Sequence, residues 1–309
     1  MGVGGCGWCR VERVAEGVYA VIDVDGGWFR SNSGLIDAGR YTIVVDTQYN
    51  ERRARDLERL IGELGLPRPG LVINTHHHGD HAWGNHVFNA PSIMHEGAAK
   101  MVELLKDIAP DMYKPFFPNL DFTGSKYTTP DIVISGPLTI NTQNGKIRLK
   151  HFGPAHTVGD IVVEVEWART AFLGDLMFNR VTPLALDGTV AGWEKVLERL
   201  VKEYGGWRLV GGHGPVGDTE VLKKIAEYFR QIIETTEKLL GAGVRDPLTI
   251  ALEIRSGPLS GWSEEERVVL NVARAIMDLE GKPPGMLAEN LPQLAMEMAE
   301  YSSRTDSRA

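Results

Sequence analysis

The sequence predicts an α/β fold followed by a helical C-terminal part. In the N-terminal part, short apolar segments bounded by turn residues alternate with a helical pattern, as expected of an α/β domain. The apolar segment 71–74 has the pattern of a short buried strand and runs directly into a cluster of histidines. From Asp218 onward, apolar residues recur at helical spacing. We therefore expect one domain over residues 10–217 and a helical extension over residues 218–309.

The individual elements follow from local patterns. Val18–Val24 predicts a strand, and Asp25-Gly26-Gly27 predicts a tight hairpin turn after it. Leu and Ile residues on one face predict a helix over 51–64 that ends at Gly65. Ser263 and Glu266 have the spacing of a capping box at the start of a later helix. Further strands are expected at 33–36, 41–45, 71–74, 132–134, 138–140, 147–151, 161–165, 170–173 and 209–210, and a further helix at about 193–204.

Residues 107–130 differ from the rest of the chain because prolines alternate with aromatic residues. A long segment of this composition predicts an ordered loop rather than a linker. Trp28 and Phe29 are expected at the tip of the preceding hairpin, where exposed large apolar side chains indicate packing or a binding role. Two alternatives stay open, namely packing under the loop 107–130 and lining a substrate pocket.

The composition narrows the classes of function. The chain of 309 residues is 43% hydrophobic and 24% charged, which is typical of a soluble globular protein. Its formal net charge is −8 without a basic cluster, which disfavours nucleic acid as a partner. No run approaches the ~20 apolar residues of a membrane span, and the N-terminus lacks the pattern of a signal peptide. We expect a cytoplasmic protein with a small-molecule substrate.

Two cysteines, Cys6 and Cys9, have C-x-x-C spacing. This spacing is compatible with a small disulfide, a redox pair, half of a metal site, or two thiols on a loosely ordered terminus. The few glutamines and the preference for Glu and Arg among charged residues are a compositional indication of a thermophile.

Histidines and aspartates gather where predicted strands end. The first group lies in THHHGDHAWGN directly after the strand 71–74, and three later residues stand in GPAHTVGD, FLGDLMF and GGHGP. Ends of strands at glycine-containing turns are where α/β proteins place ligands. The seven candidate metal ligands are His76, His78, Asp80, His81, His156, Asp175 and His213.

The spacing within the first group indicates two metal ions. In an extended segment His76 and His78 point the same way, so they can bind one ion while Asp80 and His81 turn toward a second. Imidazole and carboxylate are ligands that suit zinc, iron or manganese. The seven side chains suffice for two ions with positions left open for water, which is the mark of a catalytic site.

These residues resemble the motifs of the metallo-β-lactamase superfamily from about Val14 to Pro215. The resemblance includes the strand entry RSNSGLI and the strand-ending Asp46 of VVDT, which in relatives hydrogen-bonds behind the metal ligands. It implies a four-layer αββα sandwich and two divalent metal ions, with zinc expected and iron or manganese as alternatives. By the pattern of the family, Asp175 bridges the two ions. The first ion is expected to bind His76, His78 and His156, and the second Asp80, His81 and His213.

Among the branches of the superfamily, the chain is most similar to glyoxalase-II-like and broad-specificity hydrolases. Asp175 stands where antibiotic-destroying members usually have Cys or Ser, and His78 stands where flavin-coupled relatives usually have Glu. Phe178 replaces the Tyr that quorum-signal lactonases often place there. The helical extension carries no glutathione-binding signature that we can identify.

The resemblance predicts a hydrolase of small esters, lactones or thioesters, with side activity on phosphoesters. A metal-bridging hydroxide is the expected nucleophile, and Asp80 is the candidate to orient it. A mononuclear iron persulfide dioxygenase and a β-lactamase-like hydrolase are the alternatives, and the helical extension could form a homodimer. The histidines outside the motif are expected to be structural or exposed: His77, His86, His95 and His151. Asp160 is expected to be a turn residue.

Overall fold

The computed structural model describes residues 2–254, 257–285 and 291–306, which form two compact units. The first unit comprises the chain up to His151, Gly159–Asp175 and Gly206–Gly217. The second unit comprises Phe152–Val158, Leu176–Gly205 and the chain from Asp218 onward. The domain limits expected at 10–217 and 218–309 stay a prediction.

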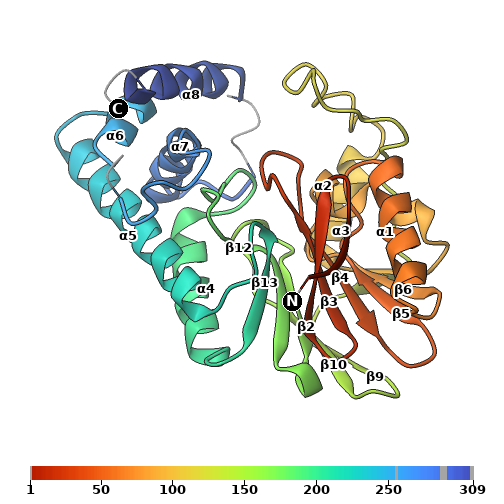
Figure 1. The fold of residues 1–309 in the computed structure, drawn as a ribbon. Helices are drawn as coiled ribbons and strands as arrows, with labels where there is room; N and C mark the ends of the chain where they lie inside the picture. The colour runs from red at the N-terminus through yellow and green to blue at the C-terminus, as the bar shows by residue number, and fades with distance from the viewer. Residues whose placement is uncertain (1, 255–256, 286–290, 307–309) are drawn as a thin grey trace. The chain divides into compact units, whose positions relative to one another are not determined.

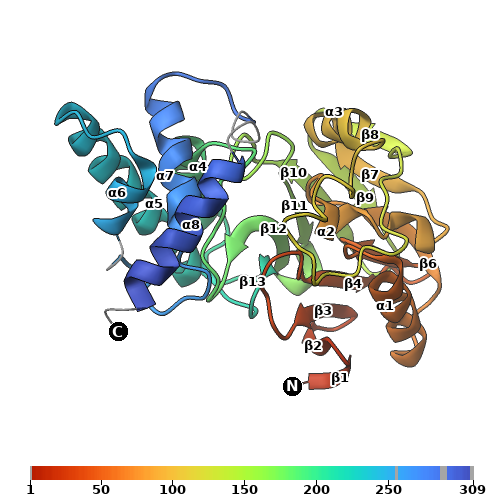
Figure 2. The same ribbon diagram turned by 90° about the horizontal axis from the view of Figure 1, so that it is seen from above.

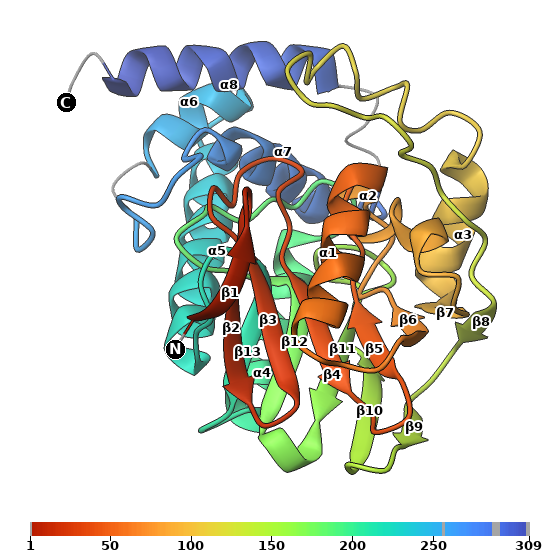
Figure 3. The same cartoon turned by 45° about the vertical axis from the view of Figure 1, so that its right-hand side comes forward.

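The first unit contains an eight-stranded sheet whose strands follow one another in sequence order. Neighbouring strands are antiparallel from the first to the fifth and parallel from the fifth to the eighth. Figure 3 shows this progression across the sheet. The strands are β1 (Gly2–Cys6), β2 (Cys9–Ala15), β3 (Val18–Asp23), β4 (Ser33–Asp37), β5 (Thr42–Val45), β6 (Pro69–Ile73), β7 (Ser92–His95) and β8 (Ile132–Ile134).

A second sheet of five strands has the order β13-β12-β11-β10-β9. Alternate residues of both sheets, such as Ile36 on β4 and Val163 on β11, meet in one buried apolar cluster. This two-sided core holds the two sheets face to face. The strands are β9 (Leu138–Asn141), β10 (Lys146–His151), β11 (Ile161–Val165), β12 (Thr170–Phe178) and β13 (Arg208–His213), with the 3-10 turn η2 (Glu166–Ala168) before β12.

Helices of the first unit connect its parallel strands. Helix α1 (Glu51–Glu63) covers one face of the eight-stranded sheet, because Leu57 and Leu60 pack with Val44 and Val72 in a second apolar cluster (Figure 1). After β6 the chain forms α2 (Gly79–Ala82) and the turn η1 (Asn85–Val87), and after β7 it forms α3 (Glu96–Leu105). The segment 107–130 that follows is an ordered loop without a helix or strand, as predicted.

The second unit is mainly helical, as predicted for the chain after Asp218. Asp218 caps its longest helix by accepting a hydrogen bond from the backbone of Glu220. Helices α5, α6, α7 and α8 gather side by side in Figure 2. The helices are α4 (Val190–Glu203), α5 (Thr219–Gly241), α6 (Pro247–Leu252), α7 (Arg267–Leu279) and α8 (Leu291–Asp306). Among the described helices, none is both long and apolar enough to span a membrane.

Two local predictions are wrong. Residues 24–32 form a wide loop between β3 and β4 instead of a tight turn at Asp25-Gly26-Gly27. The side chain of Asp23 accepts hydrogen bonds from the backbone of Asp25 and Gly26 and shapes the start of this loop. Ser263 does not cap α7, because its hydroxyl donates to the backbone oxygen of Arg180.

The cysteine pair is a disulfide in the structure. Cys6 and Cys9 face each other across the turn between β1 and β2, with their Cα atoms 4.9 Å apart. Of the alternatives that the spacing left open, the disulfide is therefore the one present.

Candidate metal centre

The first candidate ligands come from the loop after β6, at the carboxyl end of the parallel strands. His76 and His78 are two residues apart, and the Nε2 atom of His76 lies 3.0 Å from the Nδ1 atom of His78. Together with Asp175 on β12, each offers a ligand atom within 4.8 Å of the others. The extended spacing thus brings the two histidines together as predicted.

A second group forms around helix α2, which starts directly after His78. Asp80 and His81 lie on this helix, and His213 ends β13. Their ligand atoms also lie within 4.8 Å of one another. The Oδ2 atom of Asp80 is 3.6 Å from His81 Nε2 and 3.4 Å from His213 Nε2. All three side chains are buried.

Asp175 lies between the two groups. Its Oδ1 atom is 3.1 Å from His81 Nε2, and its Oδ2 atom is 3.4 Å from His213 Nε2 and 4.0 Å from His76 Nε2. The neighbouring strand must approach closely here, because a Cβ atom on Gly212 would stand 1.8 Å from Asp175 Oδ1. Glycine at position 212 therefore makes room for the carboxylate of Asp175.

Asp46 holds the second group from behind. Its carboxylate lies 2.8 Å from His81 Nδ1 and accepts hydrogen bonds from the backbone N–H and the hydroxyl of Thr75. Asp46 directly follows β5 and adopts a φ of 59°. This hydrogen bond fixes the ring of His81 so that Nε2 faces Asp80 and Asp175. The contact expected for Asp46 behind the ligands is thus present.

The carboxylates concentrate negative charge in the centre. Although burial disfavours the charged imidazole, Asp175 and Asp80 raise the pKa of His213 to about 9. At His81, burial also lowers the pKa, but the neighbouring carboxylates raise it well above its ordinary value. Burial raises the pKa of Asp46. Without a cation, protons on the histidines balance the buried negative charge.

The donor set fits divalent metal ions. Ligand atoms about 2.1 Å from a tetrahedral zinc ion are about 3.4 Å apart. The distances of 3.1 to 3.6 Å from His81 and His213 to the two carboxylates match this spacing. The Nε2 atom of His81 is buried, and no described residue gives it a hydrogen bond. A cation would satisfy this nitrogen and the carboxylates together.

The profile of the Metallo-beta-lactamase superfamily matches residues 26–213 of the sequence, which is more than half of the chain. The chain belongs to the metallo-β-lactamase superfamily. Its matched region contains both candidate ligand groups and Asp46. Membership of this superfamily, with the histidine and aspartate groups, makes the protein a metal-dependent hydrolase.

Individual relatives are distant. The chain is 22% identical over 236 residues to a type 2 metallo-β-lactamase of Bacteroides fragilis, covering 74% of this chain and 88% of the relative. It is 26% identical over 227 residues to a hydroxyacylglutathione hydrolase of Brucella ovis, covering 65% and 74%. The structure of a metallo-β-lactamase from Pontibacter korlensis matches with a TM-score of 0.59 and 18% identity, covering 72% of this chain and 99% of that one. The αββα superfamily fold with additional C-terminal helices is therefore confirmed.

His156, the remaining residue of the superfamily motif, belongs to the second unit. It is buried, and its Nδ1 atom lies 2.8 Å from the backbone oxygen of Leu184. Its ring packs against Trp193 and Phe178. When Nδ1–H donates to Leu184, Nε2 is the nitrogen that can act as a metal ligand, and the ligand role of His156 stays a prediction.

Histidines outside the superfamily motif have structural contacts. The side chain of His95 accepts a hydrogen bond from the backbone of Gly97 at the start of α3, and its ring stacks on His151 with centroids 3.7 Å apart. His86 Nδ1 lies 3.1 Å from the backbone oxygen of Trp83. His77 is buried.

The aromatic residues before and within the loop 107–130 form one cluster. The ring of Phe29 lies 5.5 Å from Trp83 and 5.1 Å from Phe117, measured between centroids. Trp28 contacts Phe117 with centroids 5.4 Å apart. For Phe29, packing under the loop is thus the alternative present.

Sequence reasoning did not find Ser31, Asn74 and Gln48, polar residues whose hydrogen bonds hold the segments that carry the ligands.

Proposed function

We propose that the protein is a binuclear hydrolase that acts on small esters, lactones or thioesters. The observation that carries this proposal is the position of Asp175, whose carboxylate lies 3.1 Å from His81 and 3.4 Å from His213 of the second group and 4.0 Å from His76 of the first. A carboxylate in this position can bind two cations at once. Two divalent cations bound here would act as Lewis acids, lowering the pKa of water toward neutrality and stabilising negative charge on a substrate oxygen.

We assign the ligands according to the motif of the superfamily. His76, His78 and His156 hold the first ion, and Asp175 is shared between the ions. Asp80, His81 and His213 hold the second ion. Zinc is the proposed metal, and iron or manganese would use the same ligand types.

Asp80 is the proposed catalytic residue. In the metal-free protein, burial raises the pKa of Asp80, but His81 and His213 lower it below its ordinary value. An ionised carboxylate can accept a hydrogen bond from the attacking water, orient it and hold its proton.

An aromatic cluster that packs against Ala82 and Trp83, directly after His81, supports acyl substrates. Trp28 contacts Phe117 of the loop 107–130, and Phe116 in the same loop is 45% exposed. Small-molecule sites are mostly apolar with a few polar anchors. The net charge of −8 disfavours polyanionic polymers such as nucleic acid. Both features support a small, partly hydrophobic ester, lactone or thioester.

Cleavage of β-lactams is a second candidate, favoured by the names of the relatives from Bacteroides fragilis and Pontibacter korlensis. Against it stands Asp175, since antibiotic-destroying members usually carry Cys or Ser at the corresponding position. Oxidation of a persulfide at a single iron is the other alternative, and it requires consumption of oxygen.

One panel of substrates decides among these functions. Metal-loaded protein is assayed with an aromatic ester, a lactone, an acyl thioester, a phosphotriester, a β-lactam and a structured RNA. We expect the highest kcat/KM on an acyl substrate, with weaker phosphoesterase activity. A higher kcat/KM on the β-lactam or RNA would contradict the proposal, as would oxygen consumption with a persulfide and one iron per chain.

A further inference from the structure

A buried ion pair lies next to the candidate metal centre but contains none of its ligands. Arg53 on α1 donates to the carboxylate of Asp23 at 2.6 Å, and the two side chains are 2% and 0% exposed. Burying two charges is costly, and an apolar pair of similar volume is often as stable. A role beyond stability would explain the pair.

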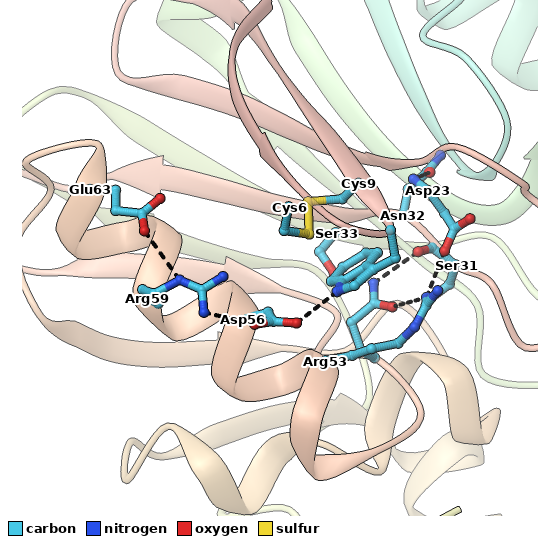
Figure 4. Close-up of a disulfide and its surroundings, with 12 residues drawn as sticks. Cys6, Cys9, Asp23, Ser31, Asn32, Ser33, Arg53, Asp56, Arg59 and Glu63 are labelled. Atoms are coloured by element: carbon cyan, nitrogen blue, oxygen red, sulfur yellow. Dashed lines mark hydrogen bonds and ion pairs between the residues drawn. A yellow bond between two sulfur atoms is a disulfide. The ribbon is translucent and has the colours of Figure 1, made fainter. Parts of the chain in front are cut away.

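Arg53 connects two parts of the first unit. Its guanidinium also donates to the side-chain oxygen of Gln48 at 3.2 Å. The ring of Trp8, which lies between the disulfide-bonded cysteines, stacks on it with 4.3 Å between Cζ and the ring centroid. Figure 4 shows Arg53 beside Asp23 and the loop residues that follow. The arginine is therefore fixed on several sides.

One branch of hydrogen bonds leads from Arg53 to His213. The second oxygen of Asp23 accepts from the backbone N–H groups of Asp25 and Gly26 at 2.8 and 3.1 Å. The backbone oxygen of Gly26 lies 3.1 Å from His213 Nδ1. Arg53 thus holds Asp23, Asp23 holds the backbone at Gly26, and Gly26 orients the imidazole of His213.

The other branch leads from Arg53 to Asp80. The side-chain amide of Gln48 donates to the backbone oxygen of Ser31 at 2.8 Å and to the hydroxyl of Ser33 at 2.9 Å. The hydroxyl of Ser31 donates to the backbone oxygen of Asp80 at 2.6 Å. This second branch ends on the backbone that carries the candidate catalytic carboxylate.

Both branches end on residues of the second group. We propose that Arg53 is a positioning residue for the second metal site, acting through Asp23 on His213 and through Gln48 and Ser31 on Asp80. This inference rests on the proposed binuclear function. It assigns Arg53 to the support of the second site, because the two branches end on His213 and on the backbone of Asp80.

Metal binding tests the inference. Metal-free protein is titrated with cobalt(II), and the absorption step missing in His213→Ala identifies the second site. We expect Arg53→Met to weaken binding in that step by about 10-fold or more, in the range found for residues that support metal ligands, and to leave the first step unchanged. Arg55→Met is the matched control, because Arg55 is on the same helix with its side chain 61% exposed. Arg55→Met should bind both ions normally.

Unchanged affinity in the second step of folded Arg53→Met, or equal weakening of both steps, would overturn the inference. If Arg53→Met does not fold, Ser31→Ala decides, because it removes only the hydroxyl that holds the Asp80 backbone and should weaken the same step.

Ring 1H–15N spectra of metal-free protein give an independent readout. The His213 signals should shift in Arg53→Met, or in Arg53→Lys if Arg53→Met does not fold, and stay in place in Arg55→Met. A wild type that binds fewer than two ions would contradict the proposed function, while the ring spectra would still decide the role of Arg53.

Discussion

The carboxylate of Asp46 lies 2.8 Å from Nδ1 of His81, while Nε2 of the same ring lies 3.1 Å from Asp175. One aspartate thus orients the imidazole from behind, and the other faces the nitrogen that would bind metal. The arrangement fixes the orientation of the His81 ring, with Nδ1 toward Asp46 and Nε2 toward Asp175.

Replacing the carboxylate of Asp46 should therefore weaken the second metal site. We expect Asp46→Asn to lower the affinity for one of two ions by about 10- to 100-fold, because an amide orients His81 less strongly and lacks the negative charge. Competition titrations with a chromophoric chelator measure this loss. Asp111→Asn is the control, since its side chain is 81% exposed, and an equal loss in that variant would refute the role of Asp46.

A methyl group at position 212 should displace the shared carboxylate. The Cβ atom of alanine at this position would lie 1.8 Å from Asp175 Oδ1, so Asp175 must move. We expect Gly212→Ala to lose affinity for both ions, measured by metal content after dialysis. Gly62→Ala, where nothing lies within 4 Å of the new Cβ, should retain both. Full metal content in Gly212→Ala would show that Asp175 is not shared.

Substitution of Asp80 and of Asp160 distinguishes a catalytic aspartate from a structural one. Asp80→Asn should lower kcat by at least ~10²-fold, because the variant cannot hold the proton of the attacking water. Asp160 is buried but lies outside the ligand groups of the first unit, so Asp160→Asn should change kcat far less. Steady-state kinetics on the best substrate of the panel measure both. A comparable loss in Asp160→Asn would mean that Asp160 is a functional residue.

The stability of the metal-free protein should fall at alkaline pH. In the folded protein Asp175 and Asp80 outweigh burial and raise the pKa of His213 from 6.5 to about 9. A pKa raised by folding stabilises the protein below pH 6.5, and this contribution disappears as the pH rises through about 9. Urea unfolding of metal-free protein across this range should show the decrease, and His213→Gln should reduce it. A stability that rises over the same range would contradict the charge balance described for the centre.

Local patterns in the sequence predicted that His76 and His78 come together, but little of the support around the candidate ligands. His76 and His78 come together because extended backbone places residues two apart on one side. The loop 24–32 was not predicted, because its shape depends on Asp23 and on Arg53 from a distant helix. The disulfide stayed one of several alternatives, since C-x-x-C spacing alone does not distinguish them. Contacts between residues far apart in the sequence, such as Arg53 with Asp23 and Ser263 with Arg180, decided several of the features that were missed.

The metal content of the purified protein tests the central claim most directly. Elemental analysis of protein reconstituted with zinc and then dialysed should give two ions per chain, as the two groups joined by Asp175 require. One tightly bound iron per chain, or no retained metal in a folded sample, would contradict the binuclear centre.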